Sequence, residues 1–461
     1  MLKNGDTIRS GGEYILRGDY TQRIIIDSTD PVTINIDGNV NYTVTGDGWY
    51  DMNTLLYVEK VPKLTINGTG ATVTGQAGTF LCSNNRDDSL PEWKINVVGG
   101  TYTTQDITFY FTEGNASYTT EVSMEHVTAT GALAVVIDYC NVEIANSVFY
   151  ETETDLGDED NSGVITVRDA EVTLNKVMAT AVNKNSGLAA IANEGGTVTV
   201  NGGTYYSWIN NSHYGTNGSV TLNNVTTHGG ILNQHELTIN GGTHTSDERV
   251  VYTGNSENDV ECVAVTRINS GTFRTNDGNH RNTIENGWTG GETYIDEQGG
   301  TTLIENDNTD CAAVLCTSGT VHVNAGKFYA PNGCAIRTSD YYYGRAEING
   351  GYISGKYAFY AAKRDWNDEM SATQINGGDL SGKEADVYLG KSRRINVGRE
   401  YSDELTVLVE IPSNGRKITM ETPDADDGSY VPYQKDLKLV SLNPGYTIGM
   451  GEQFPNSREY R

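Results

Sequence analysis

Short stretches of the chain alternate apolar and polar residues and then turn at Asn or Gly. In residues 197–205, Val198 and Val200 lie two positions apart, so their side chains share one face of a predicted strand. An Asn-Gly-Gly turn follows, and Tyr205 lies in a second short strand. A strand this short cannot bury its apolar face alone, which predicts that it stacks on copies of itself.

The same phrase returns along most of the chain, at intervals of about 17 to 31 residues. It recurs at residues 63–69, 94–102, 142–149, 172–177, 220–226, 237–244, 266–273, 321–328, 347–353 and 374–380. A fixed phrase at unequal spacing is typical of a solenoid whose coils carry loops of different length. Residues 275–300 fill one wider interval, and we predict that they hide a degenerate coil or protrude.

An Asn marks the turn in most of these coils. It stands at Asn67, Asn175, Asn201, Asn223, Asn240, Asn269, Asn324, Asn349 and Asn376. Asn adopts left-handed backbone angles at low cost, and its stacked side chains can hydrogen-bond to one another as an asparagine ladder. Val98, Glu125 and Ala145 occupy the same position and are expected to interrupt that ladder.

Aligning the coils on this Asn shows an apolar column in a strand upstream of the turn, which we predict to point inward. It contains Leu56, Leu81, Phe109, Val136, Ile165, Ala190, Leu232, Val251, Val314, Ile336, Tyr360 and Val387. A third, aromatic column follows the turn at Tyr102, Phe149, Tyr205, Phe273 and Phe328. Three strand positions per coil predict a parallel β-helix.

Three traits carry a resemblance to known proteins: SGGEYILRGDYTQ at 10–22, the repeated INGGT phrase, and ADVYLGKSRRINVG at 385–398. The chain resembles right-handed parallel β-helix proteins of pectate-lyase type, and more narrowly the repeat regions of surface or adhesin proteins of gut Firmicutes. The resemblance implies an all-β, single-stranded right-handed parallel β-helix of about a dozen coils, with an Asn-lined turn. We predict an N-terminal cap and first coil at 1–62, the β-helix at 63–390, and C-terminal capping strands with a tail at 391–461.

Charge and composition exclude some classes of binding partner. A net charge of −28 lacks the basic footprint that nucleic acids and anionic membranes require. No apolar run reaches about 18 residues, so we expect no membrane insertion. The start of the chain has no apolar signal core, which indicates a removed signal, export by another route or a phage origin. The six cysteines form no zinc-type pair, so we expect mostly buried free thiols, with one disulfide allowed.

The resemblance implies that a lyase of this type would hold Ca²⁺ on an outward strand face and take a proton with Arg or Lys. Alternation assigns these outward positions: Tyr57, Glu59, Asn84, Tyr110, Thr112, Tyr139, Thr166, Arg168, Asn193, Asn233, His235, Tyr252, Thr317, Arg337, Ser339, Lys363 and Tyr388. They are poor in the carboxylates that Ca²⁺ prefers. Arg168, which follows the acidic loop 151–161, is the nearest approach to a lyase residue.

Other catalytic signals are weaker still. Asn308-Thr309-Asp310 matches one segment of polygalacturonases, whose Gly-His-Gly and Arg-Ile-Lys segments do not occur in this sequence. In the acidic loop, Asp155, Asp158 and Asp160 could hold Ca²⁺, although their spacing does not match an EF-hand. No other cofactor is predicted. The sequence therefore favours a protein without catalysis.

Tyrosine is abundant, with 28 residues against 8 Phe, and it suits sugar rings and polar partners. The predicted ligand-binding aromatics lie in the loops at Trp208, Tyr214, Trp288, Tyr341, Tyr342, Tyr343 and Trp366. We predict an extracellular or cell-surface β-helix of adhesin or carbohydrate-binding type, with a polysaccharide or host-cell glycan as partner. It would be a monomer or part of a larger surface protein. The alternatives are a polysaccharide lyase or hydrolase, and a phage tailspike-like protein.

Overall fold

The computed structural model divides into two compact units, which we describe separately: unit 1, residues 1–229, and unit 2, residues 230–461. The structure describes residues 1–45, 53–85, 90, 92–113, 119–151, 162–181, 188–212, 218–254, 264–276, 280–287, 290–339, 344–362, 373–391, 393–398, 401, 403–410, 412, 418 and 438–448. Within these ranges the regular elements are all β-strands.

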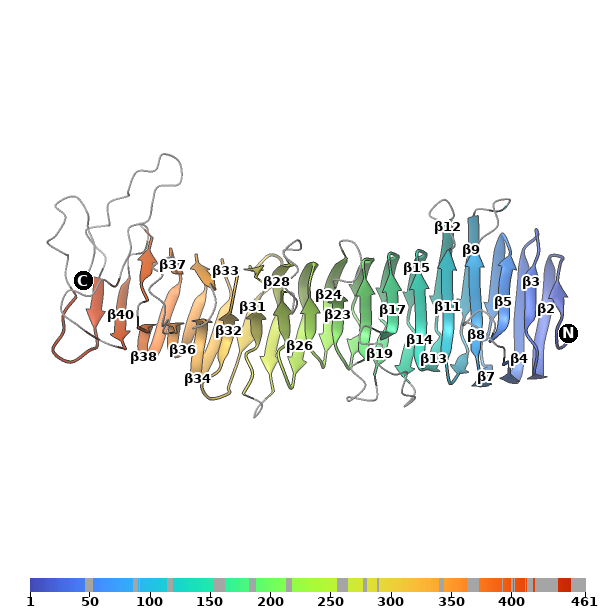
Figure 1. Ribbon diagram of the computed structural model, residues 1–461, viewed down its shortest axis with the longest axis horizontal. Helices are drawn as coiled ribbons and strands as arrows, with labels where there is room; N and C mark the ends of the chain where they lie inside the picture. The colour runs from blue at the N-terminus through green and yellow to red at the C-terminus, as the bar shows by residue number, and fades with distance from the viewer. Residues whose placement is uncertain are drawn as a thin grey trace. The chain divides into compact units, whose positions relative to one another are not determined.

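Unit 1 contains three parallel sheets, one for each strand position in a coil (Figure 1). The first sheet contains β1 (Thr7–Ile8), β3 (Ile24–Asp27), β5 (Thr54–Lys60), β8 (Thr79–Asn85), β11 (Ile107–Glu113), β14 (Leu133–Asp138), β17 (Gly163–Arg168), β20 (Ala189–Glu194) and β23 (Ile209–Ser212). The second contains the first halves of β2 (Gly12–Tyr20), β4 (Val32–Thr43) and β24 (Ser219–Thr227), with β6 (Lys63–Asn67), β9 (Glu92–Val98), β12 (Thr119–Glu125), β15 (Asn141–Ala145), β18 (Glu171–Asn175) and β21 (Thr197–Asn201). The third contains the second halves of β2, β4 and β24, with β7 (Thr72–Ala77), β10 (Thr101–Thr103), β13 (Thr128–Gly131), β16 (Val148–Glu151), β19 (Met178–Thr180) and β22 (Thr204–Tyr205).

Unit 2 repeats this arrangement. Its first sheet contains β25 (Ile231–Asn233), β27 (Val251–Thr253), β29 (Ile284–Asn286), β32 (Ala312–Cys316), the second halves of β34 (Lys327–Thr338), β36 (Tyr352–Ala361) and β38 (Asp379–Leu389), β40 (Glu404–Val409) and β41 (Lys438–Ser441). The second contains the first halves of β26 (Glu236–Ser246) and β28 (Ala264–Thr275), with β30 (Gly291–Ile295), β33 (Thr320–Val323), β35 (Arg345–Ile348), β37 (Thr373–Ile375) and β39 (Ile395–Val397). The third contains the second halves of β26 and β28, with β31 (Thr302–Glu305) and the first halves of β34, β36 and β38.

The parallel sheets confirm the predicted all-β solenoid with three strands per coil. Strands one coil apart pair in register, as β18 does with β21, where Val172 lies opposite Val198. The wide interval at 275–300 hides a coil, because β29 and β30 lie within it and β31 follows directly. The predicted boundaries at residues 62 and 390 stay a prediction.

The core of unit 1 alternates large and small residues along its third sheet. Tyr102, Ala129, Phe149 and Ala179 face one another in successive coils, and all are fully buried. Neighbouring strands are about 4.8 Å apart, so a small residue between two rings leaves each ring enough space to pack in the interior of the solenoid. The turn glycines contribute as well, since a Cβ on Gly68 would lie 2.3 Å from the Tyr102 hydroxyl. Gly68 of one coil therefore makes space for the aromatic residue of the next coil.

The predicted inward column is correct in most coils and displaced by one residue in four. The structure places Val135, Ile191, Ile231 and Phe359 at the inward position where the sequence indicated Val136, Ala190, Leu232 and Tyr360. Each of these strands has consecutive apolar residues, so alternation alone does not identify the inward one. Two further inward residues, Ile209 and Ile284, lie in coils that the alignment did not resolve.

The turn after the second strand corrects the expected role of its Asn. Positive φ angles occur one residue later, with 54° at both Lys176 and Asn224. The Asn is instead held by its side chain: Asn201 Nδ2 donates to Asn175 Oδ1 (2.9 Å), and Asn223 Nδ2 donates to Asn201 Oδ1 (2.8 Å). The amide bonds, rather than a left-handed backbone, explain why Asn recurs there.

Replacing Asn201 with Ala should lower the free energy of unfolding by about 2 kcal/mol, because two amide hydrogen bonds are lost. The change can be measured as a shift of the urea denaturation midpoint. Thr199→Ala, an outward substitution two residues earlier in β21, is the matched control and should change stability by less than about 0.5 kcal/mol. Equal midpoints for Asn201→Ala and the wild type would contradict the stabilising role of these bonds.

The cysteines agree with the prediction of buried thiols as far as they are described. Cys82, Cys140, Cys311, Cys316 and Cys334 are buried and form no disulfide among the described residues, and Cys262 lies outside them. Among the residues that the structure describes, no helix is long and apolar enough to cross a membrane.

Candidate functional site

The outward face of the second sheet in unit 2 carries polar and aromatic residues at one register position. They are Thr238, Arg267, Tyr294, His322, Glu347, Gln374 and Asn396, which we call the polar row. Their neighbours in the strands, such as Ile295 and Val323, are fully buried. Alternation therefore points the side chains of the polar row away from the core.

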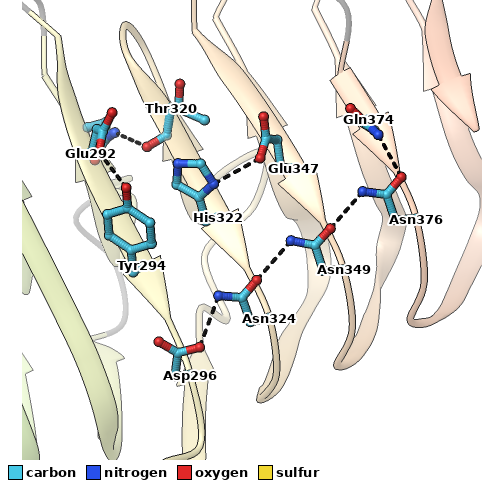
Figure 2. Close-up of polar contacts among 11 residues, drawn as sticks. Glu292, Tyr294, Asp296, Thr320, His322, Asn324, Glu347, Asn349, Gln374 and Asn376 are labelled. Atoms are coloured by element: carbon cyan, nitrogen blue, oxygen red, sulfur yellow. Dashed lines mark hydrogen bonds and ion pairs between the residues drawn. The ribbon is translucent and has the colours of Figure 1, made fainter. Parts of the chain in front are cut away.

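Four members of the polar row contact one another in sequence. The guanidinium of Arg267 lies over the Tyr294 ring, with Cζ 4.7 Å from the ring centroid. The Tyr294 and His322 rings are stacked, with centroids 4.4 Å apart and an interplanar angle of 4°. His322 Nδ1 then donates to Glu347 Oε2 at 2.9 Å (Figure 2). Because a carboxylate only accepts, this bond places a proton on Nδ1.

Glu292 supports the middle of the polar row from the same strand, β30. The Tyr294 hydroxyl donates to Glu292 Oε2 at 2.5 Å (Figure 2). This hydrogen bond, followed by desolvation and the charge of Glu292, raises the pKa of Tyr294. The phenol therefore stays neutral and remains a donor.

A line of amide bonds runs beside the polar row at the turn. Asn324 donates to Asp296 Oδ1 (3.0 Å), Asn349 to Asn324 Oδ1 (2.8 Å) and Asn376 to Asn349 Oδ1 (2.7 Å), as Figure 2 shows. Gln374, a member of the polar row, donates to Asn376 Oδ1 at 2.8 Å. The amide bonds tie four successive coils of the second sheet together where they carry the polar row.

The geometry of the polar row favours hydrogen bonding over ring stacking with a ligand. Tyr294 has Arg267 on one face and His322 on the other, so both of its ring faces are covered. The polar edges of the rings remain for a ligand. Successive strands lie about 4.8 Å apart, so the polar row offers donors and acceptors at regular intervals. An extended, hydroxyl-rich molecule would match this pattern.

A second polar surface lies on the corresponding sheet of unit 1. A groove of about 400 Å³ is lined by Lys94, Asn96, Glu121, Val122, Ser123, Asn141, Val142, Glu143, Glu171 and Thr173. Lys94 pairs with Glu121 at 2.7 Å, and Ser123 Oγ donates to Asn96 Oδ1 at 2.8 Å. Most residues that line this groove are polar or charged, so both outward faces of the second sheets are polar.

Arg168, the nearest approach to a lyase residue in the sequence, is half-buried and lies between two carboxylates. Its Nε donates to Glu194 Oε2 at 3.0 Å, and its Nη1 lies 3.6 Å from Asp138 Oδ1. Asp138 also accepts a hydrogen bond from the Tyr110 hydroxyl at 2.8 Å. Burial raises the pKa of Asp138, while Tyr110 and Arg168 oppose that rise. An arginine held between two carboxylates stays protonated and is a poor proton acceptor.

Two positions assigned outward by alternation point inward instead. Asn193 lies opposite Val167, is fully buried, and donates to Asn211 Oδ1 at 2.9 Å. Asn233 is also fully buried, and it donates to the Val265 carbonyl at 2.9 Å. Both amides satisfy polar groups inside the corner between the first and second sheets, so their role is structural.

Of the predicted binding aromatics, the structure describes Trp208, which is half-buried and whose carbonyl accepts from the Ala190 amide at 2.7 Å. Close by in sequence, Tyr206 is 46% exposed and stacks on His228, with centroids 4.9 Å apart. The other predicted positions lie outside the described residues: Tyr214, Trp288, Tyr341, Tyr342, Tyr343 and Trp366 for the ligand, and Asp155, Asp158 and Asp160 for a metal. Within the described ranges, no group of three His, Cys, Asp or Glu is placed to hold a metal ion.

Sequence reasoning missed the polar row because it sought a site on the first strand of each coil. The signal was present, since Tyr294 and His322 stand at the outward position just before the turn residues Asp296 and Asn324. Listing that position coil by coil would have found the polar row. Comparison of the chain with family models, with curated proteins and with solved structures finds no match.

Proposed function

We propose that the chain is a non-catalytic glycan-binding protein that uses the polar row of unit 2 as its binding face. The observation that carries this proposal is the contact sequence Arg267, Tyr294, His322 and Glu347 at one register position. Their mutual contacts fix the side chains before a ligand arrives, which lowers the entropy cost of binding. A glycan is the ligand class that combines an extended shape with closely spaced hydroxyl groups.

Other features support the same proposal. The neighbouring amide bonds would act as an asparagine ladder that keeps successive coils in line beneath the ligand. The resemblance to surface and adhesin repeats favours a location outside the cell, and a net charge of −28 suits an exposed, soluble surface. The proposed partner is therefore a polysaccharide or a glycan on a cell surface.

A glycan array, followed by affinity electrophoresis of the intact chain, tests this proposal. Tyr294→Ala should weaken binding to a retained glycan by about tenfold, because it removes the hydroxyl oxygen that can accept a hydrogen bond from the ligand and unstacks its neighbours. Tyr329→Ala, on the third sheet of the same unit, is the matched control and should change affinity by less than about twofold. Absence of retention on every glycan, or equal losses in both variants, would contradict the proposal.

A second candidate function is a polysaccharide lyase or hydrolase, and one observation in unit 1 favours it. Asp138 combines a raised pKa with a hydrogen bond from Tyr110, so its carboxyl group is a candidate for proton transfer, while Arg168 stays protonated beside it. Incubation with uronate polymers and Ca²⁺ would reveal unsaturated products by their ultraviolet absorbance. Product that disappears in Asp138→Asn would favour the enzyme over the binding protein.

A further inference from the structure

Unit 2 contains a second distinctive surface, on the outward face of its first sheet. Tyr360 and Tyr388 lie in neighbouring coils with their rings stacked, 4.4 Å between centroids and 3° between planes. Tyr357 packs at an angle against both, with centroids 5.5 Å and 5.1 Å away. Arg337 covers the free side of this group, with Cζ 5.3 Å from the Tyr360 ring centroid.

Arg337 is unusual because it has no acceptor among the described residues. Its Nε is shielded from solvent and makes no hydrogen bond, and within the described residues no carboxylate lies within ion-pair distance of its guanidinium. Arg249 makes the same kind of contact with Tyr252 in this sheet, but it is paired with Glu285 at 2.7 Å. In the part of the chain that the structure describes, Arg337 therefore carries a half-buried charge without a neutralising carboxylate.

Packing alone does not require a charge at this place. The same register position holds Leu232 and Leu315 in preceding coils and Leu408 in a later one. A leucine would cover the Tyr360 ring without leaving an unsatisfied donor in a shielded position. A guanidinium group suits an anionic ligand group that is rich in oxygen. Such a group is planar in a carboxylate and tetrahedral in a sulfate.

A second cation, Lys356, lies in the strand next to that of Arg337, since β34 pairs with β36. Lys356 Nζ lies 5.5 Å from the Tyr357 ring centroid and 3.9 Å from Glu384 Oε1. Burial raises the pKa of Cys334 to about 12, and the charges of Arg337 and Lys356 act against that rise. The two cations therefore lie on neighbouring strands of one sheet.

We propose that Arg337, Lys356, Tyr357, Tyr360 and Tyr388, the basic tyrosine patch, bind an anionic oxygen group, a sulfate ester or a carboxylate, carried by a glycan. The inference rests on the proposed function and names the class of glycan, because a neutral polymer would leave the patch unused. The net charge of the chain does not oppose this binding, since at physiological salt charges more than about 8 Å away are screened. Within the patch, Glu384 accepts a hydrogen bond from the Tyr357 hydroxyl and lies 3.9 Å from Lys356 Nζ, so the charge of Arg337 is the main attraction for an anionic ligand.

Isothermal titration calorimetry on the intact chain tests the proposal with three oligosaccharides of equal length: sulfated, uronate and neutral. We expect at least one anionic oligosaccharide to bind about tenfold more tightly than the neutral one, and the stronger of the two identifies the group. Arg337→Gln should abolish that preference, and Lys356→Gln should reduce it by about threefold. Arg274→Gln removes the same charge from an exposed ion pair with Asp307 and should keep the preference.

The outcomes separate this inference from the proposed function. Equal affinity for neutral and anionic oligosaccharides would overturn it, as would equal losses in Arg337→Gln and Arg274→Gln. If Tyr294→Ala abolishes binding while Arg337→Gln leaves the anionic preference intact, the polar row stands and the patch does not. If Arg337→Gln removes the preference while Tyr294→Ala has no effect, the patch stands and the polar row does not. Thermal unfolding of each variant confirms that it is folded.

Discussion

Replacing Phe109 with Ala is expected to lower the free energy of unfolding by about 4 kcal/mol, the largest loss that we predict for one substitution. Phe109 lies in β11, is fully buried, and packs near three other rings, those of Phe80, Tyr102 and Phe111. Its centroid is 5.0 Å from that of Tyr102 and 5.7 Å from that of Phe80, both at steep angles. The substitution removes apolar burial and two edge-to-face contacts together.

The cavity left by Phe109 should stay open, because the surrounding strands cannot move together. Leu81 and Val135 lie on either side at the same register position, and their strands are fixed by the parallel hydrogen bonds of the first sheet. Urea denaturation followed by circular dichroism measures the loss. Tyr139→Ala, where the side chain is 55% exposed, is the control and should cost less than about 0.5 kcal/mol. A Phe109→Ala variant as stable as this control would contradict the packing described for unit 1.

The repeat phrase was enough to predict the solenoid, because each of its parts has a separate physical role. Val198 and Val200 set the strand face, Asn201 supplies the amide bonds, and Gly203 allows close packing, since a Cβ there would lie 2.1 Å from the Val177 carbonyl oxygen. The prediction of inward residues failed where two neighbouring residues of a strand are both apolar. In Val135-Val136 both residues are buried, so the pattern did not distinguish the inward residue from its neighbour.

The candidate site was harder to predict, because its residues are ordinary in isolation. Tyr294 and His322 are 28 positions apart in the sequence, and only the strand register brings their rings together. The coil that carries Tyr294 has Asp296 in place of Asn, so the alignment on Asn omitted it. Arg337 was also not singled out by the sequence, because only the packed structure shows that it has no acceptor among the described residues.

The buried His244 should make the protein less stable in mild acid. The free energy of unfolding should fall by about 3 kcal/mol in total between pH 7 and pH 4 because of this residue. It lies in β26, fully buried, with its ring stacked on Phe273 at 4.8 Å between centroids. Burial lowers the pKa of His244 from 6.5 to about 4. Because the unfolded chain takes up the proton near pH 6.5 and the folded chain does not, the stabilising effect is complete above pH 6.5. It is lost progressively as the pH falls toward 4.

His244→Phe should remove this pH dependence, since Phe occupies the same register position in the neighbouring coil at Phe273. Urea midpoints at about pH 7.5 and about pH 5 measure it, and the stability of the variant relative to the wild type should rise by about 2 kcal/mol between them. Glu113 and Asp138, whose pKa values burial raises, act in the opposite sense in both proteins and cancel in this difference. His280→Gln, at an exposed histidine, should keep the wild-type dependence. Parallel pH profiles for the wild type and His244→Phe would mean that the imidazole takes up its proton in the folded state. That result would contradict the tight packing described around His244 in β26.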